Sequence, residues 1–262
     1  MAAPAATEAR PAPEASPSGG GRLVCEDLAA GYHSGFQLRD VSLTAGPGEV
    51  VGLIGPNGSG KSTLLKAIAG VVPIVRGNAL FGGQPLRGAT SQVAYVPQRE
   101  DVKWDFPASA LDVVLMGRFR AAGWFRRPGL SDRRHAEDAL RAVGLEGMGG
   151  RHISAFSGGQ QQRIFFARAI AQEPRVLLLD EPFSGVDAEN REICHRVIRR
   201  FADDGVVVLM ATHDLDEVQA TCSCVCCLNG RLIAFGPTAT TFTAANLKAT
   251  FGGRVAVFEA SQ

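Results

Sequence analysis

Apolar positions along the chain alternate between short strand-like runs and stretches with helical spacing. The strand-like runs are Leu23–Glu26, Phe36–Leu43, Glu49–Ile54, Ala79–Phe81, Val93–Val96, Val176–Leu179, Val206–Ala211 and Val225–Leu228. Helical spacing covers Lys61–Ala69, Ala110–Arg118, Ser131–Val143, Glu189–Phe201 and Leu215–Thr221. Because apolar strands alternate with helices, the pattern predicts an α/β fold with a mostly parallel sheet.

The same pattern predicts the domain organisation. Residues 1–21 are rich in Ala, Pro and Gly and contain too little apolar surface to form a core, so we predict a disordered tail. Residues 22–262 then form one unit. Within it we expect a catalytic core of residues 22–97 and 165–236, a helical subdomain of residues 98–164, and a C-terminal extension of residues 237–262, whose role the sequence does not reveal.

Composition narrows the class of protein. The formal net charge is +1, so there is no basic excess of the kind that nucleic-acid binding requires, and we expect no nucleic-acid partner. Four of the six cysteines lie between residues 222 and 227, a poor disulfide framework that favours a reduced, cytosolic compartment. No apolar run reaches the roughly 20 residues that span a bilayer. A function at a membrane would therefore need another chain to supply the span.

A phosphate-binding loop is the most specific motif. It follows the apolar run Val50–Ile54, precedes a predicted helix, and fits the pattern G-x-x-x-x-G-K-S/T: Gly55, Pro56, Asn57, Gly58, Ser59, Gly60, Lys61 and Ser62, with Thr63 next. Glycines allow backbone N–H groups to surround an anion at the helix N-terminus. We expect Lys61 to contact the β- and γ-phosphates of ATP, and the Ser62 hydroxyl to coordinate Mg²⁺.

Two adjacent carboxylates follow the apolar strand Val176–Leu179. Carboxylates at this end of a strand lie where open α/β sheets bind ligands. Asp180 is suited to holding Mg²⁺, directly or through water, and Glu181 to polarising the attacking water as a general base. A strand followed by Asp-Glu alone would equally fit a solvated loop. The phosphate-binding loop favours the functional interpretation.

The run Phe156-Ser157-Gly158-Gly159-Gln160 resembles the signature sequence of ABC ATPases, with Phe in place of the usual leucine. Small residues expose N–H groups and a hydroxyl at a helix start, so Ser157 also fits an ordinary N-cap. The resemblance implies a P-loop NTPase (RecA-like) core with an N-terminal antiparallel β subdomain and an inserted helical subdomain. It also implies a homodimer, since the signature of one subunit faces the γ-phosphate bound by the other.

The resemblance extends to four further positions. Tyr32 resembles the aromatic residue that stacks on adenine, or else a strand residue of the core. Gln98 resembles the glutamine that joins the core to the helical subdomain and contacts Mg²⁺ or water. The segment Ser184–Asp187 resembles the loop that crosses the dimer interface, and Asp187 is its expected site residue. His213 resembles the histidine that contacts the γ-phosphate. Glu181, His213 and Gln98 are thus the expected catalytic residues.

The stretch Val96–Pro107, together with Asp112–Arg118, is similar to the ATPases of manganese, zinc and iron uptake systems. This resemblance implies an ATP-hydrolysing subunit on the cytoplasmic face of the plasma membrane. Its implied partners are an integral membrane permease and an extracytoplasmic substrate-binding lipoprotein. The alternatives are an ABC ATPase for a different substrate and one with no role in transport.

Two features allow competing interpretations. We expect Trp104 and Phe106 to form an apolar patch that receives the permease, the alternative being that Trp104 packs within the helical subdomain. Close thiolates can bind metal, but we favour packing for the cysteine cluster. Strand alternation predicts one direction for Cys222, Cys224 and Cys226 and the opposite direction for Cys227.

Overall fold

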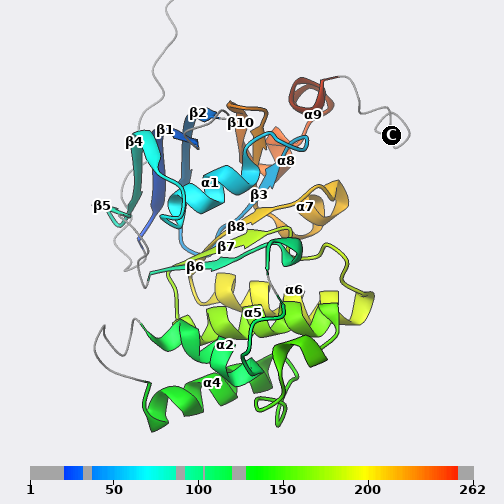
Figure 1. Cartoon of the computed structure of the whole chain (residues 1–262). Coiled ribbons are helices and arrows are strands. Elements are labelled where there is room, and N and C mark those ends of the chain that lie inside the picture. Colours follow the sequence, from blue (N-terminus) through cyan, green and yellow to red (C-terminus); the bar gives the residue numbers. More distant parts are fainter. Residues whose placement is uncertain (1–20, 32–36, 87–91, 103, 120–127, 253–262) are drawn as a thin grey trace, which may run out of the picture.

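The computed structural model describes residues 21–31, 37–86, 92–102, 104–119 and 128–252. Two sheets and a layer of helices make up the described part of the chain (Figure 1). The larger sheet crosses the middle. The smaller sheet lies on one side of it, and the helical layer covers the face that points away from the smaller sheet. These layers match the predicted fold class: a P-loop core, an antiparallel β subdomain and a helical subdomain.

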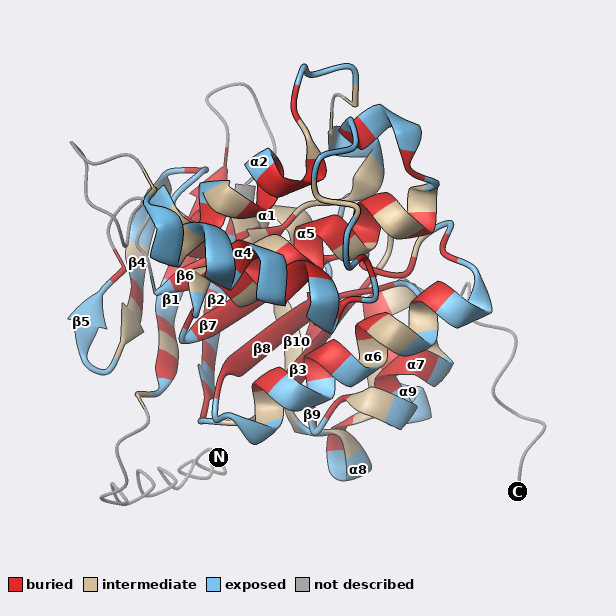
Figure 2. Cartoon of the chain, turned by 90° about the horizontal axis from the view of Figure 1, so that it is seen from below, coloured by how far each residue is buried: buried red, intermediate tan, exposed pale blue. Residues whose placement is uncertain are grey.

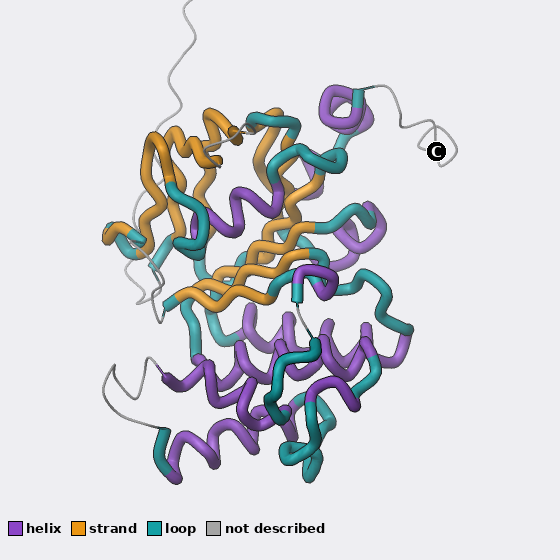
Figure 3. The backbone as a smooth tube through the Cα atoms, in the orientation of Figure 1, coloured by secondary structure: helices purple, strands orange, loops and turns teal. Residues whose placement is uncertain are grey.

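The larger sheet is the six-stranded core, in the order β10-β9-β3-β8-β7-β6 (Figure 3). Its strands are β3 (Val50–Ile54), β6 (Val93–Val96), β7 (Val176–Asp180), β8 (Val207–Ala211), β9 (Cys224–Leu228) and β10 (Leu232–Pro237). All neighbours pair in parallel except β10, which is antiparallel to β9. The parallel arrangement brings the carboxyl ends of β3, β6, β7 and β8 to one edge of the sheet, where the site residues follow.

Strands β3, β7, β8 and β9 are buried along their whole length, because the sheet is covered on both faces. Alternate side chains therefore enter two separate apolar clusters. Leu177 and Leu179 pack with the helical layer, while Val176 and Leu178 pack with the smaller sheet. Figure 2 shows the buried strands between exposed helical surfaces. In the sequence, burial on both faces gives these strands unbroken apolar runs instead of an alternation of apolar and polar residues.

The smaller sheet has the order β2-β1-β4-β5 and is antiparallel throughout. Its strands are β1 (Leu23–Gly31), β2 (Gln37–Ala45), β4 (Ile74–Phe81) and β5 (Gln84–Pro85). Strands β1 and β4 are several residues longer than the sequence pattern predicts, β2 is shifted by one or two residues, and β5 was not predicted. The extra residues of β1 and β4 include exposed polar positions, which an apolar pattern does not detect.

Helix α1 (Lys61–Ile68) follows the phosphate-binding loop on one side of the core sheet. The other side carries α2 (Ala110–Leu115), α4 (Leu130–Ala142), α5 (Gly158–Gln172) and α6 (Ala188–Asp203). Short 3₁₀ turns cover Arg99–Asp101, Met116–Arg118 and Ile153–Ala155. Helix α5 contacts α2, α4 and β6, so it crosses the predicted boundary between residues 164 and 165 and joins the helical layer to the core.

The C-terminal part of the described chain is ordered structure. Helix α7 (Leu215–Thr221) precedes β9, and β10, α8 (Thr238–Thr241) and α9 (Ala244–Phe251) follow. Buried Leu247 of α9 packs on the core. The sequence pattern missed β10, α8 and α9 because most of their residues are partly or fully exposed. No helix within the described ranges is both long and apolar enough to cross a membrane.

All six cysteines are buried and free. Cys224 and Cys226 pack in the cluster on the side of the smaller sheet, whereas Cys222 and Cys227 pack in the cluster on the helical side. The predicted direction of Cys222 is therefore wrong. Cys222 lies at the end of α7, before β9 begins, so strand alternation does not apply to it. Burial raises the pKa of the Cys222 thiol to about 12, which favours the neutral form.

Candidate nucleotide-binding and hydrolysis site

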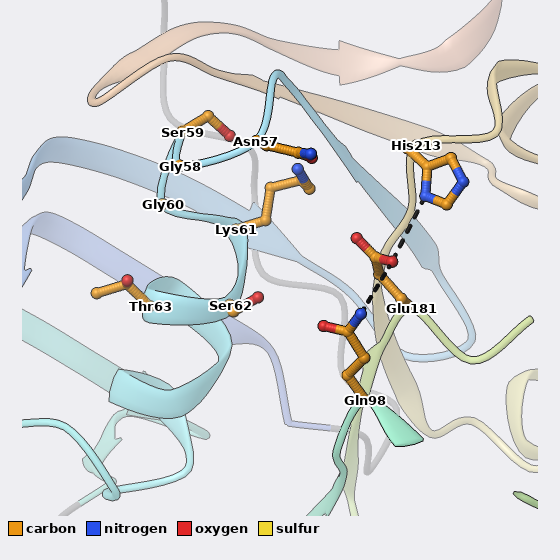
Figure 4. Close-up of a pocket in the computed structure, with 10 residues that line it drawn as sticks. All are labelled: Asn57, Gly58, Ser59, Gly60, Lys61, Ser62, Thr63, Gln98, Glu181 and His213. Carbon is orange, nitrogen blue, oxygen red and sulfur yellow. Dashed lines mark hydrogen bonds and ion pairs between the residues drawn. The ribbon is translucent and has the colours of Figure 1, made fainter. Parts of the chain in front are cut away.

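A cleft of about 780 Å³ opens at the carboxyl edge of the core sheet (Figure 4). The phosphate-binding loop forms one wall, and residues that follow β6, β7 and β8 form the other. The lining residues are Asn57, Gly58, Ser59, Gly60, Lys61, Ser62, Thr63, Gln98, Glu181 and His213. Segments far apart in the sequence thus converge on one cavity because their strands are parallel neighbours.

The loop owes its shape to its glycines. Gly60 is the N-cap of α1 with φ of 102°, and Gly55 has φ of 155°. A Cβ at Gly55 would lie 2.0 Å from the Leu228 carbonyl oxygen, so no other residue fits there. The loop therefore curls closely against β9 and directs the start of α1 into the cleft. A helix N-terminus in this position attracts phosphate groups.

Lys61 is buried, and its Nζ donates to the carbonyl oxygens of Gly55 at 2.8 Å and Pro56 at 3.3 Å. Burial lowers the pKa of Lys61, while the charges of Glu181 and Asp180 oppose that shift. The ammonium group thus has backbone carbonyls as hydrogen-bond partners and two carboxylates as charged neighbours. Phosphate oxygens at the helix start would offset the desolvation that burial imposes on the ammonium group.

Ser62 lines the cleft, and its Oγ donates to Oδ1 of Asp180 at 2.8 Å, although Asp180 itself is not a lining residue. The hydroxyl of Tyr95 donates to Asp180 Oδ2 at 3.0 Å. Asp180 is almost fully buried, and burial raises its pKa, although the hydrogen bonds from Ser62 and Tyr95 act in the opposite direction. Such a desolvated carboxylate is suited to a divalent metal.

Tyr95 belongs to this site although we did not predict it. It lies on β6, paired with Leu178 of the neighbouring strand β7. A tyrosine one strand away from the acidic pair, in a run of otherwise apolar residues, is the only indication that the sequence offers. The register of β6 against β7 determines the contact, and a single sequence does not reveal it.

Glu181 is held in an unusual backbone conformation. Its φ of 47° lies in the left-handed region, which costs about 1 kcal/mol for a residue with a side chain. The Glu181 N–H donates to the Ala211 carbonyl oxygen at 3.0 Å, which secures the turn after β7. The side chain then points into the cleft (Figure 4).

Gln98 and His213 both approach the same carboxylate oxygen. Gln98 Nε2 donates to Glu181 Oε2 at 3.4 Å, and His213 Nδ1 lies 3.5 Å from that oxygen. The His213 side chain is 64% exposed, whereas that of Glu181 is only 18% exposed. The three residues predicted for catalysis therefore meet at the mouth of the cleft, with Glu181 central.

The predicted signature residues lie elsewhere. Ser157, Gly158, Gly159 and Gln160 begin α5, and none of them lines the cleft. Ser157 accepts a hydrogen bond from the Gln160 N–H, and the Gln160 side chain accepts one from the Ser157 N–H. Ser157 is thus the N-cap in a reciprocal capping box. Its side chain stays exposed at the helix start.

Asp187 is the N-cap of α6 and is also absent from the lining of the cleft. Gly55 and Pro56 do not line the cleft either, but their carbonyl oxygens accept hydrogen bonds from Lys61, which does. Tyr32 falls outside the described residues, so its predicted role remains a prediction. The structure therefore brings together one group of predicted site residues and leaves Ser157–Gln160 and Asp187 apart from it.

Sequence comparison finds relatives that are ATP-binding proteins, in agreement with the phosphate-binding loop in the cleft. A sequence model of the ABC transporter family matches residues 38–184. The manganese transport system ATP-binding protein MntB of Bacillus subtilis is 43% identical over 230 residues, which are 88% of this chain and 92% of that protein. The zinc transport system ATP-binding protein TroB of Treponema pallidum is 41% identical and covers 88% of this chain and 86% of its own length.

The fold comparison gives the same answer. A solved structure described as a metal-chelate type ABC transporter in an inward-facing conformation superposes with a TM-score of 0.77 and 31% identity. The match covers 88% of this chain and 89% of that one. The phosphate-binding loop, the acidic pair after β7 and the family match over more than half of the chain lead to one conclusion: the chain belongs to the ABC transporter family, as an ATP-binding subunit that hydrolyses ATP.

Proposed function

We propose that this subunit powers the uptake of divalent metal ions, manganese, zinc or iron, through a separate integral membrane permease. The observation that carries the proposal is the identity of 43% and 41% to subunits named for manganese and zinc transport. A chelated iron transport protein of Yersinia pestis, YfeB, is 40% identical and covers 88% of this chain. The transported ion would pass through the permease, so the cleft of this chain handles only the nucleotide.

The cleft supports a division of roles in ATP hydrolysis. Lys61 and the loop N–H groups would hold the phosphates, and Glu181 would polarise the attacking water as general base. Glu181 is suited to this role because its turn directs it into the cleft and both Gln98 and His213 restrain its carboxylate. His213 is exposed at the mouth, where it could contact the γ-phosphate.

The residues also fit Mg²⁺. Ser62, Asp180 and Gln98 offer hydroxyl, carboxylate and amide oxygens, the donors that Mg²⁺ prefers. No cluster of three or more His, Cys, Asp or Glu side chains suited to a metal lies among the described residues. That agrees with an ion bound by few protein ligands together with the phosphates. When bound, Mg²⁺ would neutralise charge that develops on the phosphate oxygens.

We infer a head-to-tail homodimer from the residues that the cleft leaves out. Ser157 and the first turn of α5 form an anion-binding helix start, but the cleft of the same chain does not include them. A second copy of the chain would bring its own cleft against this surface. Asp187, exposed at the start of α6, would lie at the same interface.

The segment after Gln98 offers a surface for the permease. Phe106 is 55% exposed, whereas Trp104 packs edge-to-face on Phe165 of α5 at 5.4 Å and donates to the Arg99 carbonyl oxygen at 3.0 Å. Trp104 therefore follows the alternative interpretation and packs within the helical layer. Of the two aromatic residues Trp104 and Phe106, Phe106 is the one left to contact a partner. A permease there would place this subunit peripherally at the cytoplasmic face of the membrane, with a substrate-binding lipoprotein on the opposite side.

Deleting the gene and measuring cellular manganese, zinc and iron tests the function. Wild-type chain should restore accumulation of at least one of these metals, and Glu181→Gln should not. If accumulation of all three metals is unchanged while the purified protein hydrolyses ATP, the metal assignment is wrong. That result would favour an ABC ATPase for a different substrate or for a non-transport process.

A further inference from the structure

Asn190 lies where the start of α6, capped by Asp187, meets the start of α5, which is capped by Ser157. It is the third residue of α6, and only 9% of it is exposed. Its backbone N–H donates to Asp187 Oδ1 at 2.9 Å, as in any capped helix. Its side chain does more: Nδ2 donates to Asp187 Oδ1 at 2.7 Å and to Oδ2 at 2.6 Å. A buried amide thus holds both oxygens of an exposed carboxylate.

The same amide packs directly on the signature. A Cβ added to Gly159 would lie 2.6 Å from Asn190 Cγ and 2.6 Å from Nδ2, so α5 meets α6 at a point where only glycine fits. Gly159 is buried and follows Ser157 by two residues. The Asn190 amide, whose Nδ2 holds Asp187, therefore also packs against the first turn of α5.

We infer that Asn190 is a positioning residue, which fixes the Asp187 loop relative to Ser157 so that both can engage the same partner subunit. This inference rests on the proposed head-to-tail dimer. Asp187 and Ser157 come from different helices, yet both would have to reach one partner cleft together. A rigid link between the two helix starts keeps their spacing constant.

The choice of residue supports a positioning role. Asn190 Oδ1 is buried, and among the described residues it has no hydrogen-bond partner. A buried unsatisfied oxygen is unfavourable, and an apolar residue would avoid it. Asparagine is nevertheless well suited here, because its Nδ2 group has two donors and can hold both oxygens of Asp187.

The substitution Asn190→Asp tests the link through pH. It keeps the shape of the side chain but replaces the donor with a second carboxylate. Two carboxylates in this contact repel each other at high pH, whereas at lower pH they share a proton and the hydrogen bond returns. Among the described residues, Arg163 of α5 is a charged group that acts on Asp187. In the wild type, the hydrogen bonds from Asn190 hold the pKa of Asp187 low, so its carboxylate stays ionised across the tested range.

The experiment measures kcat for ATP hydrolysis at saturating Mg-ATP from pH 6 to 8.5 with the purified full chain. We expect Asn190→Asp to lose on the order of tenfold at pH 8.5 and to recover towards the wild-type rate as the pH falls. Asn190→Ala should lose activity to a similar extent at every pH. Asn246→Asp is the matched control, since Asn246 is the third residue of α9 behind its N-cap Thr243, and its ratio to wild type should stay flat.

Several results would overturn the inference. One is an Asn190→Asp ratio that does not change with pH, and another is wild-type kcat in Asn190→Ala. If Asn190→Asp does not fold, as judged by thermal unfolding and nucleotide binding, Asn190→Ala alone decides. Failure of the dimer proposal would be seen separately, as a Glu181→Gln chain with intact Asn190 that binds ATP but does not dimerise.

Discussion

The cleft and the signature surface, formed by residues 157–160 at the start of α5, differ in how complete they are within one chain. The cleft is enclosed by segments that follow β3, β6, β7 and β8, and its polar groups already contact one another. Ser157, at the start of α5, faces outward and is satisfied only by its own capping box. In the proposed dimer, the cleft binds nucleotide within one chain and the signature residues complete the site of the partner. The proposal therefore predicts that mutations separate nucleotide binding, which is local, from hydrolysis, which requires the second copy.

The largest effect is expected in the cleft. Glu181→Gln should retain ATP binding but reduce hydrolysis by about 10²-fold or more, because it removes the general base and keeps the size of the side chain. ATP should then hold the chains together as a dimer, which size-exclusion chromatography with and without ATP would detect. Turnover close to wild type would remove Glu181 from this role.

The signature surface should respond in the opposite way. Ser157→Arg should leave nucleotide binding unchanged, because Ser157 is not part of the cleft, but it should abolish ATP-driven dimerisation and lower hydrolysis at least tenfold. Mixing it with Lys61→Ala chains should restore one competent site per dimer. Normal hydrolysis by Ser157→Arg alone would show that the two regions do not cooperate.

Trp104 and Phe106 distinguish a contact within the chain from a contact with a partner. Trp104→Ala should destabilise the isolated chain by about 2–3 kcal/mol, since it removes the packing on Phe165. Phe106→Ala should change stability by about 0.5 kcal/mol or less and weaken association with the permease. Thermal unfolding and co-purification with the permease measure the two effects. Unchanged permease binding by Phe106→Ala would contradict the proposed surface.

A smaller effect is expected at Tyr95, which contacts Asp180 beside the cleft. Tyr95→Phe removes one hydrogen bond to Asp180 and should weaken Mg-ATP binding about fivefold, with metal-free ATP binding unchanged. Since the Tyr95 hydrogen bond helps to lower the pKa of Asp180, its loss makes protonation easier. The defect should therefore grow as the pH falls. Titration calorimetry at two pH values would check this, and equal loss with and without metal would count against it.

The smallest effect is expected on stability, at the contact between α6 and α7. His195 of α6 stacks on Phe183, and its Nε2 lies 3.4 Å from Glu217 Oε2 of α7. Burial raises the pKa of Glu217, but hydrogen bonds from His195 and Thr221 outweigh it, so the net shift is downward. This contribution to stability is present above the unfolded-state pKa and is lost as the pH falls through the lowered one.

Glu217→Gln should accordingly lower Tm by about 2–4 °C at neutral pH, and the difference from wild type should shrink as the pH falls below about 4. Thermal unfolding followed from pH 7 to pH 3 provides the measurement. A difference that stays constant over that range would mean that the ionised carboxylate makes no contribution.

Periodicity predicted the core elements closely, and the differences have physical causes. The predicted strand Val93–Val96 and helix Leu215–Thr221 have the bounds that the structure gives them. Strand β10 and helices α8 and α9 were missed, because partly exposed residues carry no clear period. Cys222 was placed on the wrong side, because the residue belongs to the end of a helix and the pattern of the following strand was extended over it.

The sequence by itself determined which residues of local motifs the fold brings to the cleft or next to it. Lys61, Asp180 and Glu181 could be assigned because each stands at a fixed place in a local motif, where a strand ends and a loop or helix begins. Contacts between distant elements were decided only by the tertiary structure. Tyr95 reaches Asp180 because β6 lies beside β7 in a particular register, and Asn190 packs on Gly159 because α5 and α6 approach at their first turns. Register and helix approach depend on the packing of the whole core, and no short stretch of sequence encodes them.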